Sequence, residues 1–69
     1  MDPAERDGLI LALDRLPPEE REVLRLRFVD GLDLADTARA MGRTDREVVR
    51  LQARALRALR AELGPDSLP

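Results

Sequence analysis

Apolar residues recur along this chain at the three- and four-residue spacing that is typical of amphipathic α-helices. The last such segment is the clearest, because apolar positions lie on one side of a helical wheel and arginines on the other. The apolar positions are Val48, Leu51, Ala55, Leu56, Leu59 and Leu63, and the arginines are Arg46, Arg50, Arg54, Arg57 and Arg60. Thr44 with Glu47 three residues later is a capping box, and Gly64 before a proline is a stop signal. The pattern predicts a helix over 44–63.

Three shorter helices are predicted before this one. Their expected ranges are 3–15, 18–29 and 33–41. The first must end before Pro17 and Pro18, which cannot continue a helix, whereas Pro18 can begin the second. Asp33 is the expected N-cap of the third helix, and Gly42 supplies a tight turn into the fourth. The order of these signals predicts a helix-turn-helix at the C-terminal end of the chain.

The apolar face of each helix predicts the core. The expected contributors are Leu9, Ile10 and Leu13 from the first helix, some of Val23, Leu24, Leu26 and Phe28 from the second, and Leu34, Ala38 and Met41 from the third. Phe28 and Met41 are most simply interpreted as core residues. Small side chains at Ala35 and Ala38 should let the third helix lie close against the fourth.

Length and composition limit the class of protein. A chain of 69 residues with one aromatic residue predicts a small all-α, four-helix domain over 1–63, followed by a flexible tail at 64–69. No cysteine or histidine is present, so disulfides, common zinc sites and thiol nucleophiles are excluded, and neither an enzyme nor a cofactor is expected. Asp30, Asp33 and Asp36 lack the downstream glutamate of a calcium loop. No apolar run reaches the length of a membrane span, so a cytoplasmic location is expected.

Charge is polarised along the chain although the net charge is only −2. Residues 43–60 contain six arginines and two acids, a local charge of +4, whereas residues 1–42 carry −4 and residues 61–69 carry −2. No acid lies within the arginine row of the fourth helix, which favours a polyanion as its partner. A second arginine group is expected to form intramolecular ion pairs instead. That group is Arg21, Arg25 and Arg27, beside Glu19, Glu20 and Glu22.

Two blocks of sequence resemble the C-terminal region 4 of extracytoplasmic-function (ECF) sigma factors of the bacterial sigma-70 family. The blocks are ALDRLPPEEREVLRLRFVDGL and ADTARAMGRTDREVVRLQARALRALR, and the resemblance extends over about 11–63. The first block matches the family pattern at Leu16, Pro17, Arg21, Val23, Leu26, Arg27, Gly31 and Leu32. The second matches it at Gln52, Arg54, Ala55, Leu56 and Arg57. A helix-turn-helix alone is a weak signal, whereas the two blocks together are fairly specific.

The resemblance implies that the fourth helix enters the major groove of the promoter −35 element while the third crosses the phosphate backbone. The resemblance implies DNA contacts by Arg43, Thr44, Arg46, Arg50 and Arg54. Arg57 is a further DNA-binding candidate because it belongs to the same arginine row. Val49 stands where a basic residue is usual. Asp45 and Glu47 either repel phosphate or accept a hydrogen bond from cytosine N4. Weak DNA binding by the isolated chain is therefore expected, with tethering in a polymerase complex compensating for it.

The resemblance also implies docking to the β flap of RNA polymerase and regulation by an anti-sigma factor. Exposed aliphatic side chains are needed for such docking, and the sequence leaves open which residues line a groove and which lie in the core. The candidates are Leu24, Phe28, Leu32, Leu59 and Leu63.

Two other classes of protein remain open from sequence. One is the DNA-binding domain of a LuxR-type response regulator, which usually ends in a dimerising helix and lacks the Leu-Pro helical hairpin. The other is a region 4-like module that serves only protein–protein contacts. A monomer is expected, and the missing region 2 favours a fragment of a longer sigma factor.

Overall fold

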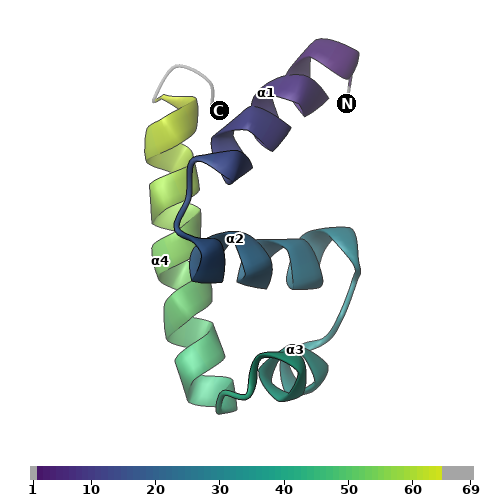
Figure 1. The fold of residues 1–69 in the computed structure, drawn as a ribbon, viewed down its shortest axis with the longest axis vertical. Helices are drawn as coiled ribbons and strands as arrows, with labels where there is room; N and C mark the ends of the chain where they lie inside the picture. The colour runs from purple at the N-terminus through teal and green to yellow at the C-terminus, as the bar shows by residue number, and fades with distance from the viewer. Residues whose placement is uncertain (1, 65–69) are drawn as a thin grey trace.

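The computed structural model describes residues 2–64 as an all-helical fold (Figure 1). The elements in order are α1 (Pro3–Asp14), α2 (Pro18–Leu24), a π-helical segment η1 (Arg25–Val29), α3 (Leu34–Met41) and α4 (Asp45–Leu63). No strand occurs within the described residues. The predicted all-α fold with four helices and a C-terminal helix-turn-helix is confirmed. Of the tail predicted at 64–69, residues 65–69 lie outside the described part of the chain.

The helix ends follow local signals in the sequence. The Asp33 carboxylate accepts a hydrogen bond from the Asp36 N–H at 2.8 Å, which caps α3 at its N-terminus. Pro18 occupies the first turn of α2, where its missing N–H costs no helical hydrogen bond. Gly42 ends α3 in the left-handed conformation, with φ of 65°. These ends agree with the expectations from sequence.

Helix α4 is the element against which the other helices pack. It lies against α2 most extensively and also against α3 and α1. Figure 1 shows α2 beside the middle of α4 and α3 beside its lower end. The core cluster is Leu16, Val23, Leu24, Ala38, Val48, Leu51 and Ala55. Leu16 precedes the paired prolines, so the connection between α1 and α2 is anchored in the core.

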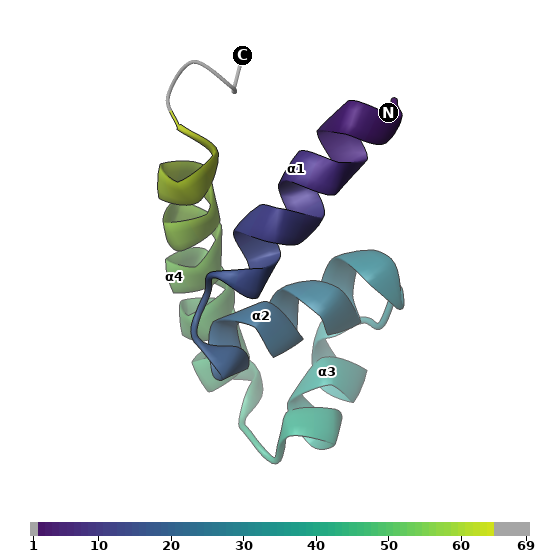
Figure 2. The ribbon, with the colours of Figure 1, turned by 45° about the horizontal axis from the view of Figure 1, so that its top comes forward.

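Two residues predicted for the core lie on the surface. Phe28 is 60% exposed, and Ile10 is also exposed. In an α-helix Phe28 would share the buried face of Leu24 at i+4. The segment instead closes with a five-residue hydrogen bond from the Asp30 N–H to the Arg25 carbonyl at 2.9 Å, so the α-helical period on which that assignment rested does not hold over Arg25–Val29. Ile10 is exposed because the N-terminal half of α1 diverges from the other helices (Figure 2).

Two smaller corrections concern the helix-turn-helix. Ala38 is buried, as expected, but Ala35 is exposed, so only Ala38 allows the close approach of α3 to α4. Leu56 was expected on the apolar face of α4, yet it is 41% exposed. Met41, in contrast, packs against the core as predicted.

The same substitution at two glycines is expected to change stability in opposite directions. Gly42→Ala forces an L-residue into the left-handed region and should destabilise the fold by about 1 to 2 kcal/mol. Gly8→Ala, in the middle of α1 with open space around the added methyl group, should stabilise it by about 0.5 to 1 kcal/mol. Urea unfolding of both variants tests this. Equal effects at the two sites would contradict the assigned role of Gly42.

Candidate nucleic-acid interface

The outward face of α4 carries a row of arginines. The buried residues Val48, Leu51 and Ala55 hold the opposite face of this helix in the core. The exposed arginines are Arg46, Arg50, Arg54 and Arg57. No ion pair or hydrogen bond within residues 2–64 involves the side chains of these four residues. Their charges are therefore available to a partner.

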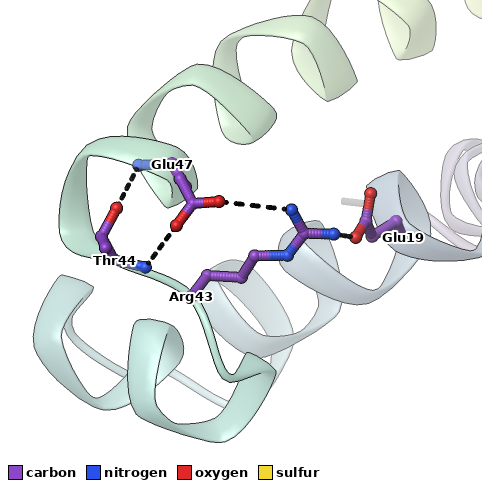
Figure 3. Close-up of polar contacts among 4 residues, drawn as sticks. All are labelled: Glu19, Arg43, Thr44 and Glu47. Carbon is purple, nitrogen blue, oxygen red and sulfur yellow. Dashed lines mark hydrogen bonds and ion pairs between the residues drawn. The ribbon is translucent and has the colours of Figure 1, made fainter.

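A complete capping box begins α4. The Glu47 N–H donates to the Thr44 hydroxyl at 3.1 Å, and the Thr44 N–H donates to the Glu47 carboxylate at 3.0 Å (Figure 3). The Thr44 backbone N–H, with its hydroxyl and the nearby Arg43 guanidinium, lowers the pKa of Glu47 below its ordinary value. Glu47 is therefore ionised at neutral pH. The amides of Asp45 and Arg46 remain the free donors of the first turn.

Arg43 lies directly before this helix and is held by two carboxylates. Its Nη2 pairs with Glu19 of α2, and its Nη1 lies 3.5 Å from Glu47 (Figure 3). The sequence predicted Arg43 as a DNA contact and did not predict either pair. The sequence gives little indication of the Arg43–Glu19 ion pair, since Glu19 precedes Arg43 by more than twenty residues and approaches it only through the packing of α2 on α4.

A polar hollow of about 210 Å³ lies beside the capping box. It is lined by Glu19, Arg43, Glu47, Arg50, Leu51 and Arg54. Two of the predicted DNA-binding arginines, Arg50 and Arg54, thus share one concave surface with the Arg43 ion pairs. Arg46 and Arg57 lie on the same helix outside this hollow.

The prediction that the arginines of the second helix form intramolecular ion pairs is wrong. Within the described residues Arg21, Arg25 and Arg27 form no ion pair. Arg27 instead donates from Nε to the Gln52 side-chain oxygen and from Nη1 to the Leu32 carbonyl, both at 2.9 Å. This part-buried arginine therefore fastens η1 and the following loop to the middle of α4.

An apolar groove of about 260 Å³ lies between α1, η1 and the C-terminal half of α4. It is lined by Leu9, Leu13, Leu24, Phe28, Val29, Leu56 and Leu59. Three predicted partner residues, Leu24, Phe28 and Leu59, therefore meet in one groove. Leu63 lines an adjoining hollow with Leu56 and Leu59, whereas Leu32 lies outside both. The other four lining residues were not among the predicted partner contacts, and they are Leu9, Leu13, Val29 and Leu56.

No group of three or more acidic, histidine or cysteine side chains within residues 2–64 is arranged to hold a metal ion. None of the described helices is both long and apolar enough to cross a membrane.

Comparison with known proteins agrees with this geometry. The family model for sigma-70, region 4 matches residues 12–61. Over 59 residues the chain is 47% identical to the ECF RNA polymerase sigma factor BldN of Streptomyces coelicolor, a match that covers 86% of this chain and 22% of BldN. A solved structure of an RsbN–BldN complex matches with a TM-score of 0.78 and 42% identity, over 80% of this chain and 40% of that chain.

A helix-turn-helix with an exposed arginine row defines a DNA-binding class of protein. Within that class, the chain belongs to the sigma-70 region 4 family. The predicted resemblance to an ECF sigma factor is confirmed, and the LuxR-type alternative is set aside. The chain spans about a fifth of the length of BldN.

Proposed function

We propose that α4 recognises the −35 element of a promoter when this chain acts within an RNA polymerase holoenzyme. The observation that carries the proposal is the row of exposed arginines at four- and three-residue spacing, Arg46, Arg50, Arg54 and Arg57, none of them paired within residues 2–64. Membership of the sigma-70 region 4 family supports the same role. In helix-turn-helix proteins the second helix of the motif lies in the major groove.

The spacing of the arginines suits base contacts. Residues four apart on a helix are separated by about 6 Å along its axis, and base pairs follow at about 3.4 Å. Arg50 and Arg54 can therefore address base edges about two base pairs apart, each donating two hydrogen bonds to guanine O6 and N7. The exposed Thr44 at the start of α4 is placed to contact a phosphate oxygen.

Selection of promoter sequences tests this function. A holoenzyme containing the full sigma factor that carries this chain is incubated with randomised duplexes, and bound sequences are recovered. Enrichment of one motif upstream of the start site, lost when α4 is replaced by that of another sigma factor, is the expected result. Polymerase binding without any motif dependent on α4 would contradict DNA reading and favour a module for protein contacts alone.

The apolar groove supports a second role, docking of a protein helix. Three large side chains on its rim, Phe28, Val29 and Leu56, are exposed although they are apolar. A groove of this kind fits the apolar face of an amphipathic helix. We propose the β flap of RNA polymerase as one occupant. That BldN occurs in a complex with RsbN supports a regulatory protein partner, such as an anti-sigma factor, for this chain as well.

Two equally exposed apolar residues provide a matched test of docking. Phe28 lines the groove and Leu11 does not, yet each is 60% exposed. Phe28→Ala should weaken binding of the isolated β flap segment by about 2 kcal/mol, or about 30-fold, as expected for a central aromatic contact. Leu11→Ala should leave binding unchanged. Calorimetry measures both, and similar losses in the two variants would place the partner elsewhere.

A further inference from the structure

We infer that Glu19 limits the affinity of this chain for DNA: it withholds Arg43 from the phosphate backbone and so weakens binding to DNA of any sequence. The inference rests on the proposed DNA-reading function of α4. Glu19 itself belongs to α2, outside the helix-turn-helix, and contacts the DNA-facing surface only through Arg43.

Arg43 has no free terminal nitrogen in this structure. One pairs with Glu19 and the other lies near Glu47, and all three side chains are between 38% and 48% exposed. Glu47 is held in place by the capping box, so the arginine is drawn toward a fixed carboxylate on one side and toward α2 on the other (Figure 3). The guanidinium is thereby fixed at the leading edge of the recognition helix.

The charge balance at this edge is unfavourable for phosphate. One guanidinium between two carboxylates gives a local charge of −1, whereas Arg50 and Arg54 line the same hollow without any ion pair to residues 2–64. A DNA strand that approaches the hollow meets the guanidinium groups of Arg50 and Arg54, one and two turns into α4, which are not paired within residues 2–64. At the start of α4 the same strand meets no net positive charge.

Withholding this arginine lowers the affinity for DNA of every sequence by a similar factor. Phosphate contacts carry no sequence information, and they supply nearly all of the affinity for non-cognate DNA. One phosphate contact fewer therefore lowers binding to every sequence, while the base contacts proposed for Arg50 and Arg54 still act on the cognate one. The ratio of cognate to non-cognate binding is therefore set by the base contacts and not by Arg43.

Glu19 is the residue at which the effect can be isolated. Glu47 also caps α4, so its substitution would disturb the start of the helix. Within residues 2–64, Glu19 makes one ion pair, with Arg43. Glu22 on the same helix is exposed and forms no ion pair with the described residues, so Glu22→Gln is a control with the same change in net charge.

The test measures binding of the 69-residue chain to a scrambled duplex and to the duplex selected by the holoenzyme, by fluorescence anisotropy at several salt concentrations. Glu19→Gln should free Arg43 for one phosphate, which steepens the salt dependence by about 0.9 in the log–log slope. Between about 50 and 200 mM salt this adds about 3.5-fold to the loss of affinity. At the low-salt end the variant should bind the scrambled duplex about threefold or more tightly, and Glu22→Gln should not.

The double variant decides whether the effect acts through Arg43. In an Arg43→Gln background, Glu19→Gln should no longer change the slope. If the change persists there, or if Glu22→Gln produces it equally, Glu19 acts by general charge and the inference is wrong. A wild-type chain that prefers the selected duplex, with Glu19→Gln behaving identically, overturns the inference and leaves DNA reading intact. Failure of the holoenzyme selection described above would overturn DNA reading by α4, and the inference with it.

Discussion

Replacing Arg50 or Arg54 by alanine is expected to lower transcription from a cognate promoter by about 5- to 150-fold, which corresponds to about 1 to 3 kcal/mol for a lost bidentate base contact. Both side chains are exposed, unpaired within residues 2–64 and directed into the same hollow. The measurement is in vitro transcription by a holoenzyme reconstituted with each variant. Circular dichroism should show unchanged helical content, because neither side chain contributes to the core.

The control variants separate contacts to bases from general electrostatic attraction between the chain and DNA. Arg6→Ala, on the exposed N-terminal half of α1, removes the same charge and should leave transcription unchanged. Arg50→Lys and Arg54→Lys retain the charge but lose the planar pair of donors. A lysine variant that restores activity would assign that position to phosphate. Full activity of both alanine variants would show that this face of α4 does not enter the groove.

The second large effect is expected at Leu51, on the inner side of the same helix. Leu51 is 5% exposed and belongs to the core cluster, so Leu51→Ala should lower the free energy of unfolding by about 2 to 5 kcal/mol. A chain of this size is typically stable by about 3 to 10 kcal/mol. A substantial part of that stability would be lost, and the docking of the helix that positions the arginine row would be weakened. Urea unfolding followed by circular dichroism measures the change.

Val49 provides a matched control for that experiment. It lies two residues away on the same helix and is 52% exposed, so Val49→Ala should change stability by no more than about 0.5 kcal/mol. Comparable losses from the two substitutions would mean that α4 is not docked through the Leu51 face.

The helix-turn-helix was predictable because its signals are local. Thr44 and Glu47 satisfy each other across one turn, Asp33 caps α3 in the same way, and Gly42 adopts a conformation that other residues avoid. The arginine row of α4 was equally predictable, since helical periodicity alone separates it from Val48, Leu51 and Ala55. These features do not depend on which helix packs against which.

The docking groove was only partly predictable. The leucines of α1, α2 and α4 indicated which face of each helix is apolar. They did not indicate how much of each apolar face another helix covers. Phe28 and Val29 belong to the π-helical segment and are exposed, and Figure 2 shows the N-terminal half of α1 diverging from the other helices. A period of 3.6 residues assigned Phe28 to the core, and this assignment failed where the period changed.

The sequence by itself determined the helices, their caps, the turn and the row of arginines along α4, because each arises from residues within one or two turns of each other. Only the tertiary structure decided which arginines remain free. Packing of α2 against α4 brings Glu19 to Arg43, and Arg27 of η1 reaches Gln52, whereas Arg50 and Arg54 form no ion pair with any residue of 2–64. Ion pairs between residues far apart in sequence depend on the relative placement of helices, which periodicity does not specify.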